Sequence, residues 1–281
     1  MNPVFNSSGL LDPLTMIENI VGLACVYYHD IGRATRFAAI AGVGNILQWN
    51  VSNPNVFTPN WFVTQQGHSL YVFVAGTDLS TGNYNHLWAD VQGYTARRSS
   101  PDDTFQSQGW FSIAGDDISL AVQQLIAGLP PNTIQTVYLT GHSYGAGSAQ
   151  WAGLSLARAL PGLAVSVLAF ATPKLILGNY PYAKPGVFIS VNVWNDPVPY
   201  APWNPVVGGL PISGIAGILL GNSGDAQWTD PSTRIFIMKD GTLSQNTDPN
   251  YGQIPPLAIS VDAHRIGSYI NQFAAYAQGM A

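Results

Sequence analysis

The chain has 281 residues, enough for one large α/β domain, and no linker-like stretch, repeat or low-complexity block divides it. Only 9% of the residues are charged, so much of the surface must be uncharged or apolar, which suits a protein that works on apolar or interfacial substrates. The net charge of −5 without a basic cluster argues against nucleic-acid binding, and no apolar run is suited to spanning a membrane.

The first residues lack the basic and apolar regions of a secretory signal peptide. The compartment stays open on this basis, with a secreted protein (as a mature form or by another route) slightly favoured over a cytoplasmic one. The single cysteine excludes an intramolecular disulfide. The sequence does not indicate an oligomeric state.

The N-terminal half contains a clear pattern of elements. Apolar residues at helical spacing predict a helix over residues 11–28, whereas residues 46–63 are typical of loop with short strands. Residues 69–75 form a short apolar run of strand length. Residues 78–104 are rich in turn residues around one short amphipathic piece, which indicates an excursion from the domain. A further helix is predicted over residues 113–129, with two aspartates in its first turn.

The C-terminal half alternates strands with helices. Apolar and β-branched runs predict strands over residues 136–140, 164–171, 187–194 and 234–238, and helical patterns predict helices over residues 145–160 and 262–278. This alternation predicts an α/β fold, with a central, mostly parallel sheet flanked by helices. We expect one domain over residues 1–281.

The stretch Gly141-His-Ser143-Tyr-Gly145 follows a predicted strand and precedes a predicted helix. This is the context of the Gly-x-Ser-x-Gly nucleophile elbow, in which a sharp turn presents the serine. The two glycines fit because a Cβ at either position would collide across the turn. The pattern indicates Ser143 as a nucleophile.

A serine nucleophile needs a histidine base and a carboxylate that orients it, in the order serine, acid, histidine in this type of fold. His264 is the only histidine after the elbow, and the only glutamate lies far upstream, so the acid must be an aspartate. Asp196 ends a predicted strand, where α/β sheets present functional groups. Four others are typical of solvated turns, the first two being kept as reserve candidates for the acid: Asp225, Asp230, Asp240 and Asp248.

The oxyanion of an acyl-transfer site requires donors, and the backbone N–H after the nucleophile, that of Tyr144, supplies one. Thr77, which follows the strand over residues 69–75, is the candidate for the second. His142 is expected to pack or hydrogen-bond beneath the elbow, beside the substrate site, rather than to catalyse. The other histidines have no metal-like spacing and no Asp-rich loop has calcium-site spacing, so we expect no metal and no cofactor.

Five segments resemble the class 3 lipase family in sequence and order: Phe73-Val-Ala-Gly76-Thr77, His86-Leu-Trp88-Ala-Asp90, Gly141-His-Ser143-Tyr-Gly145, Asn195-Asp196-Pro-Val198 and Asp262-Ala-His264. The resemblance covers roughly residues 65–275. It implies an α/β-hydrolase fold and an ester hydrolase with Ser143, Asp196 and His264 as triad and with Thr77 and Tyr144 as oxyanion donors.

The resemblance also implies a lid, inserted at about residues 78–92, with Leu87 and Trp88 on it. Two departures stand out. Ala75 occupies a position where familiar fungal members have arginine, and Tyr144 stands where leucine is more usual. These differences leave the substrate open.

The leading hypothesis is a triacylglycerol lipase that acts on acyl-ester lipids at an oil–water interface through an acyl-enzyme. Within ester hydrolases, a short-chain esterase, a phospholipase A1 and a feruloyl-type esterase are alternatives. An acyltransferase is an alternative from another enzyme class, and a non-catalytic lipid-binding protein is the non-enzymatic one. The last alternative is disfavoured, because all three triad members are present.

Overall fold

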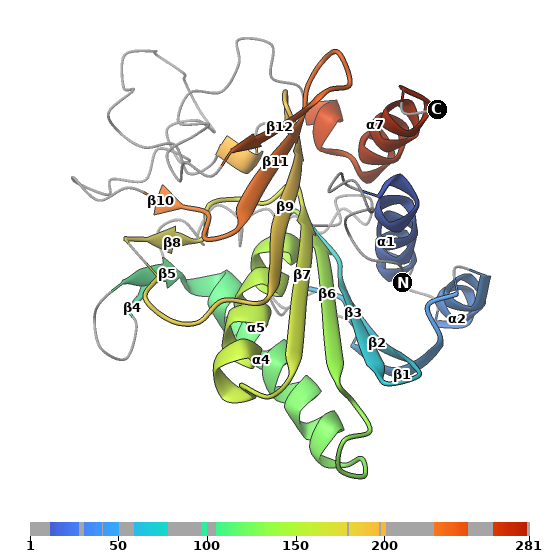
Figure 1. Cartoon of the computed structure of the whole chain (residues 1–281), viewed down its shortest axis with the longest axis vertical. Helices are drawn as coiled ribbons and strands as arrows, with labels where there is room; N and C mark the ends of the chain where they lie inside the picture. Colours follow the sequence, from blue (N-terminus) through green and yellow to red (C-terminus); the bar gives the residue numbers. More distant parts are fainter. Residues whose placement is uncertain are drawn as a thin grey trace.

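The computed structural model describes residues 12–27, 31–40, 42–50, 59–77, 97–99, 105–178, 180–196, 198–200, 228–246 and 261–279. At its centre lies an eight-stranded sheet in which neighbouring strands follow the order β1-β2-β3-β6-β7-β9-β11-β12 (Figure 1). In that order the strands are β1 (Asn45–Asn50), β2 (Trp61–Gln66), β3 (Ser69–Val74), β6 (Thr136–His142), β7 (Ala164–Phe170), β9 (Val187–Val193), β11 (Thr233–Ile237) and β12 (Leu243–Asn246). The strands from β3 to β11 are parallel, and β1, β2 and β12 add antiparallel edges.

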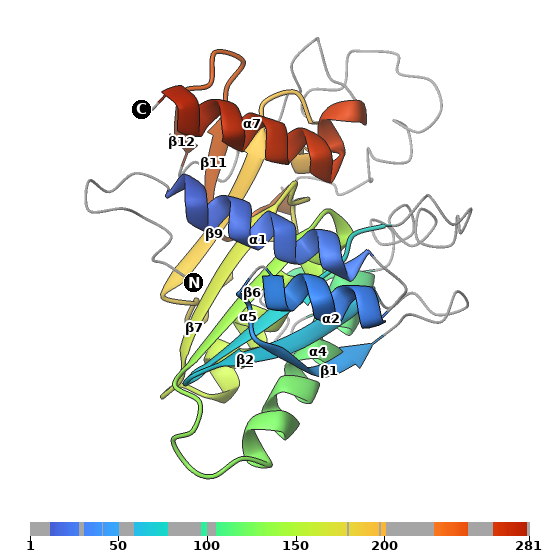
Figure 2. The same ribbon diagram turned by 90° about the vertical axis from the view of Figure 1, so that its right-hand side faces the viewer.

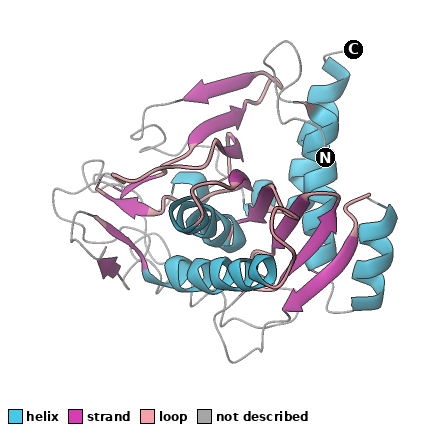
Figure 3. Cartoon of the chain, turned by 60° about the horizontal axis from the view of Figure 1, so that its bottom comes forward, coloured by secondary structure: helices cyan, strands magenta, loops and turns pink. Residues whose placement is uncertain are grey.

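Helices cover both faces of this sheet. The helices α1 (Pro13–Val26) and α7 (Ile266–Gly279) lie side by side on one face, with α2 (Ile31–Ile40) next to α1 (Figures 1 and 2). On the other face lie α4 (Gly109–Ala127) and α5 (Tyr144–Ala159), which pack against each other, and Figure 3 shows the resulting layers. This is the predicted α/β fold with a mostly parallel sheet.

The alternation of side chains along the strands divides the core into two. In β3, Leu70, Val72 and Val74 belong to the cluster beneath α4 and α5, whereas Tyr71 and Phe73 belong to the cluster beneath α1 and α7. Successive side chains of a strand point to opposite faces, so a continuous apolar strand feeds both clusters. All five side chains are buried, as expected for the interior of a parallel sheet.

A small second sheet lies beyond α5 and was not predicted. Its four antiparallel strands are β10 (Trp228–Thr229), β8 (Ile176–Leu177), β5 (Gln106–Gln108) and β4 (Arg97–Ser99), in that order (Figure 1). Two- and three-residue strands are too short to show a sequence period. The helix α2 was also missed, because the structure buries only Ala34 and Ala38 among its described side chains and it lacks a broad apolar stripe.

Two predicted helix boundaries were wrong, and the second of them concerns the site. The helix α4 begins at Gly109 rather than at residue 113, so Asp116 and Asp117 lie two turns inside it rather than in the first turn. The predicted final helix is divided into a 3-10 turn, Val261–His264, and α7, so His264 ends a short turn that precedes the helix.

The predicted lid, residues 78–92 with Leu87 and Trp88, lies outside the described residues. Among the helices that the structure describes, none is long and apolar enough to cross a membrane.

Candidate active site

Ser143 occupies the turn between β6 and α5 in a conformation that few side chains adopt. Its φ is 58° and its ψ is −124°, and its N–H donates to the carbonyl of Phe170 at 3.0 Å. A Cβ added to Gly141 would lie 2.1 Å from the carbonyl oxygen of Gly145, and one added to Gly145 would lie 2.3 Å from that of Ala75. The backbone therefore passes itself too closely at both positions for any residue but glycine.

Three side chains from distant parts of the chain meet at this turn. Ser143 Oγ lies 2.7 Å from His264 Nε2, and His264 Nδ1 lies 3.0 Å from both carboxylate oxygens of Asp196. Asp196 follows β9. The strands β6, β7 and β9 are parallel, so β6 and β9 end at the same edge of the sheet. An ionised carboxylate only accepts, so Nδ1 carries the proton and Nε2 accepts the serine O–H. The hydroxyl is thus bonded to a base in the tautomer that can remove its proton.

Asp196 has no exposed surface, yet its carboxylate is well supplied with donors. Besides His264, the N–H of Val198 donates to Oδ1 at 2.9 Å and the hydroxyl of Tyr269 donates to Oδ2 at 2.7 Å. Burial alone would raise the pKa of Asp196, but the charge of His264 and the hydrogen bonds from His264, Tyr269 and Val198 together hold that pKa below its ordinary value. The carboxylate is therefore ionised at neutral pH.

Tyr269, on α7, belongs to the site and was missed in the sequence. It is fully buried, and its hydroxyl accepts from the N–H of Val193 at 3.1 Å while it donates to Asp196. Burial, followed by the charge of Asp196, raises its pKa well above the ordinary value, so the hydroxyl stays protonated and can donate. The only feature of the sequence that could have indicated Tyr269 is its position five residues after His264, the candidate base.

His142 lies beneath the base and links it to the N-terminal helix. Its Nε2 lies 2.9 Å from the carbonyl of His264, its Nδ1 lies 2.9 Å from the hydroxyl of Tyr27, and the N–H of Gly76 donates to that hydroxyl at 2.9 Å. Burial, reinforced by the charge of His264, lowers the pKa of His142 to about 3. The ring is therefore neutral: Nε2–H donates to the carbonyl, and Nδ1 accepts the O–H of Tyr27.

This arrangement assigns His142 a supporting place. Its ring stacks on that of His264 with centroids 4.9 Å apart, and only 4% of the residue is exposed. Both ring nitrogens are bonded within the protein, so His142 supports the base from inside and does not face a substrate. Tyr27, which follows α1, was not among the sequence candidates.

The loop that contains Thr77 passes directly beside the nucleophile. A Cβ added to Gly76 would lie 2.9 Å from Cβ of Ser143 and 2.6 Å from the carbonyl of His142. Tyr144 begins α5, and its side chain turns away to pack edge-to-face on Phe111, with ring centroids 4.9 Å apart. Any contribution of residue 144 to the site therefore comes from its backbone.

The other aspartates considered as acids are placed differently. Asp240 is an exposed turn residue, as expected, and accepts the N–H and the hydroxyl of Thr242. Asp230 lies in the short connection between β10 and β11, as expected, but it is only 3% exposed and forms a buried ion pair with Arg234, so the expected solvation was wrong. Asp225 and Asp248 lie outside the described residues. Within the described part of the chain, no three His, Cys, Asp or Glu side chains gather as a metal site would require.

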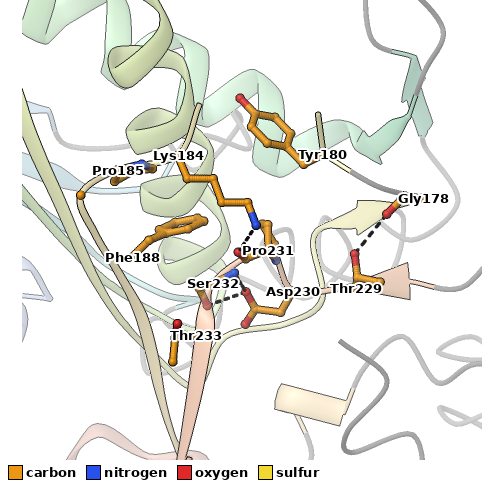
Figure 4. A pocket seen from close by; sticks show the side chains of 11 residues that line it. Gly178, Tyr180, Lys184, Pro185, Phe188, Thr229, Asp230, Pro231, Ser232 and Thr233 are labelled. Carbon is orange, nitrogen blue, oxygen red and sulfur yellow. Dashed lines mark hydrogen bonds between the residues drawn. The ribbon is translucent and has the colours of Figure 1, made fainter. Parts of the chain in front are cut away.

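The pocket drawn in Figure 4 has a volume of about 580 Å³. Tyr180 and Phe188 line it together with Lys184, Asp230 and Ser232, and none of Ser143, Asp196 and His264 is among its lining residues. Phe188 lies near the start of β9, whereas Asp196 follows the end of that strand. The pocket is therefore not part of the candidate active site.

Several solved lipases have a similar fold. The triacylglyceride lipase of Rhizomucor miehei is 14% identical, with a TM-score of 0.59 over 89% of this chain and 91% of that one. A triacylglycerol lipase from Penicillium expansum is 17% identical, with a TM-score of 0.59 over 90% of this chain and 93% of that one. A further triacylglycerol lipase, whose catalytic centre is formed by a serine protease triad, is 14% identical, with a TM-score of 0.59 over 92% and 94%. This likeness confirms the predicted α/β-hydrolase fold.

Sequence comparison gives the family. No curated protein sequence matches the chain significantly. Residues 59–205, however, match the family described as Lipase (class 3), over a stretch that contains β3, the elbow and Asp196. Because the match spans more than half of the chain, the protein belongs to the class 3 lipase family and is a carboxylic ester hydrolase.

Proposed function

We propose that the protein is a triacylglycerol lipase in which Ser143 is the nucleophile, His264 the general base and acid, and Asp196 the residue that orients and stabilises the imidazole. The observation that carries this proposal is the continuous line of contacts from Ser143 Oγ to His264 Nε2, at 2.7 Å, and from His264 Nδ1 to Asp196, at 3.0 Å. The strained backbone of Ser143 adds support, because strain of this kind is concentrated at functional sites.

In the acylation step, Ser143 Oγ attacks the ester carbonyl carbon while His264 Nε2 takes the hydroxyl proton. The buried carboxylate of Asp196 stabilises the imidazolium that forms. Negative charge develops on the carbonyl oxygen, where the backbone N–H groups of Thr77 and Tyr144 are the proposed donors. The imidazolium then protonates the leaving alcohol as its bond to the carbonyl carbon breaks, which leaves an acyl ester on Ser143.

Deacylation repeats these steps with water. His264 removes a proton from a water molecule, whose oxygen attacks the acyl carbonyl. The same donors stabilise the second oxyanion, and His264 returns the proton to Ser143 Oγ as the fatty acid leaves. The site needs no other titrating group, and the low pKa of His142, about 3, keeps the histidine beneath the base from competing for the proton.

The choice of triacylglycerol rests on three observations. The structurally similar proteins named above are triacylglycerol lipases. Only 9% of the residues are charged, which suits a protein at an oil–water interface. The resemblance to class 3 lipases also predicts a lid-like insertion directly after the proposed oxyanion residue Thr77.

The test compares an emulsified long-chain triacylglycerol with a soluble p-nitrophenyl butyrate, a phosphatidylcholine and a feruloyl ester, with Ser143→Ala as the blank. We expect the triacylglycerol to be hydrolysed fastest, with a rate that rises sharply when the substrate exceeds its solubility. A preference for the soluble ester without such a rise would indicate an esterase. Preference for phosphatidylcholine or for the feruloyl ester, or net acyl transfer to an added alcohol, would replace the proposal by that activity.

A further inference from the structure

A second buried charged pair lies apart from the proposed triad. Asp230 is 3% exposed and Arg234 is 1% exposed, with Arg234 Nε 3.7 Å from Asp230 Oδ2. Removing two charges from water is costly, and apolar replacements of such pairs often preserve stability. The pair therefore calls for an explanation beyond its contribution to stability.

Asp230 is fixed firmly in place. Its Oδ2 accepts the hydroxyl of Ser190, from β9, at 2.9 Å, and its Oδ1 accepts Gln150 Nε2, from α5, at 3.2 Å. The N–H and the hydroxyl of Ser232 also donate to Oδ1, at 2.9 and 2.6 Å. These donors come from three parts of the fold, so the carboxylate is a rigid anchor for the guanidinium of Arg234.

Arg234 connects this anchor to the turn that follows the proposed catalytic aspartate. Its Nη2 donates to the carbonyl of Pro199, in the 3-10 turn Val198–Tyr200. The N–H of Val198 in the same turn donates to Asp196 Oδ1 at 2.9 Å. Arg234 therefore binds the middle residue of this turn, Pro199. The first residue of the same turn, Val198, binds the carboxylate of Asp196.

The last residue of the turn packs on the same strand as Arg234. Arg234 Cζ lies 5.1 Å from the ring centroid of Phe236, and the ring of Tyr200 lies 5.8 Å from that of Phe236. The hydroxyl of Tyr200 donates to the carbonyl of Trp194 at 2.6 Å, which closes the loop on both sides of Asp196. Arg234 and Phe236, two residues apart on β11, therefore contact Pro199 and Tyr200, which are consecutive in the turn.

We propose that Arg234, anchored by Asp230, is a positioning residue for Asp196: it fixes the turn Val198–Tyr200, and thereby the N–H of Val198 and the carboxylate that orients His264. The inference rests on the proposed role of Asp196 as triad acid. Asp230 and Ser232 also line the pocket of about 580 Å³ (Figure 4). Through Arg234, this network runs from the wall of that pocket to the turn beside Asp196.

The charges of the network fit this role. Lys174 is a second fully buried cation whose charge acts on both Arg234 and Asp230. Burial, followed by the charge of Arg234, lowers the pKa of Lys174 to about 7, although Asp230 opposes this. Arginine keeps its charge at every relevant pH. The hydrogen bond from Arg234 to the carbonyl of Pro199 therefore persists when Lys174 loses its proton.

The test separates positioning from folding by means of paired variants. Arg234→Met removes the ion-pair partner of buried Asp230 and leaves only Lys174 as a nearby buried cation, and we expect its Tm to fall. The double variant Asp230→Asn/Arg234→Met removes both charges, and its Tm should recover. Arg234→Lys keeps the charge but presents a single ammonium in place of a planar fork. Arg158→Met is the matched control, because it removes a cation that lies 5.4 Å over the ring of Tyr182, away from the turn.

For each folded variant, kcat and KM on p-nitrophenyl butyrate and the rate at which a fluorophosphonate labels Ser143 are measured. We expect the double variant to lose about tenfold in kcat and in labelling rate with KM unchanged, the loss of one hydrogen bond to a charged donor being of that order. Arg234→Lys should be intermediate and Arg158→Met unchanged. The proposal is refuted if the double variant, or Arg234→Lys should the double variant not fold, has the wild-type kcat. Activity in Ser143→Ala would instead overturn the proposed triad.

Discussion

Replacement of Tyr269 by phenylalanine removes a single oxygen atom from the centre of the site. That oxygen donates to Asp196 Oδ2 at 2.7 Å and accepts the N–H of Val193 at 3.1 Å. The ring is fully buried and its shape is kept, so no cavity larger than the hydroxyl results. The change therefore tests whether the hydroxyl of Tyr269 holds the Asp196 carboxylate in place and lowers its pKa.

The expected loss of activity follows from the hydrogen bond that Asp196 loses and from those that it keeps. A hydrogen bond to a charged group contributes about 1.5–3 kcal/mol, and a factor of ten in rate corresponds to about 1.4 kcal/mol. Asp196 keeps its bonds from Val198 and His264, so the lower end applies, and we expect kcat to fall about tenfold. The unfolding free energy should fall by about 1–3 kcal/mol, because the N–H of Val193 loses its acceptor.

The pH dependence follows from the lowered pKa of Asp196. A carboxylate whose pKa is lowered by folding contributes stability that is present above its unfolded pKa and is lost as the pH falls through the folded pKa. The Tyr269 hydroxyl is one cause of that lowering, so the phenylalanine raises the folded pKa towards the unfolded one. The variant should therefore lose less stability than the wild type on acidification from pH 7 to pH 3.

The assays are kcat on a soluble ester and urea unfolding at several pH values. Tyr276→Phe, two turns further along α7, is the matched control and should leave kcat and the acid dependence unchanged. Wild-type kcat together with an unchanged acid dependence in Tyr269→Phe would refute the assignment of this hydroxyl to the site.

Three further variants test other parts of the site. Gly141→Ala should abolish activity and lower the Tm, because its Cβ would meet a backbone oxygen at 2.1 Å, whereas Gly267→Ala on α7, with nothing within 4 Å, should retain activity. Tyr27→Phe leaves the N–H of Gly76 without the acceptor that holds the loop beside Ser143, so kcat should fall about tenfold and the free energy of unfolding by about 1–3 kcal/mol; an unchanged kcat would contradict the role given to Tyr27. Lys174→Met should be more stable than the wild type at pH 6, by at most about 5 kcal/mol. Between pH 7 and 10.5 the unfolded wild-type lysine still holds the proton that the folded one, with a pKa of about 7, has lost. The wild type therefore gains stability as the pH rises through this range, and the advantage of the variant should shrink. An advantage independent of pH, measured by urea unfolding, would contradict the buried, easily deprotonated state of Lys174.

The parts of the site that depend on local chemistry could be predicted from the sequence. The elbow requires a strand, two glycines and a helix within a short stretch, and the residues around Ser143 display all of these. Asp196 could be selected because a functional carboxylate is expected where a parallel strand ends. The structure brings both within reach of His264, as the order along the chain indicated.

The residues that were missed act over long separations in sequence. Tyr269 contacts a residue 73 positions away, and the hydroxyl of Tyr27 bonds to a ring 115 positions away. No periodicity or motif records such pairings, since they arise only when α1 and α7 pack on the same face of the sheet. Asp230 was misread because its neighbours resemble a solvated turn, whereas its burial depends on Ser190 and Gln150 from other elements.

Intact mass analysis after reaction with a fluorophosphonate, with ester hydrolysis followed in the same samples, tests most directly whether Ser143 is the nucleophile. The proposed triad predicts one adduct per chain, located on Ser143, with a proportional loss of activity. It also predicts no adduct in Ser143→Ala and labelling slowed by at least about a hundredfold in His264→Ala. An adduct on any other residue, or hydrolysis that survives in Ser143→Ala, would contradict it.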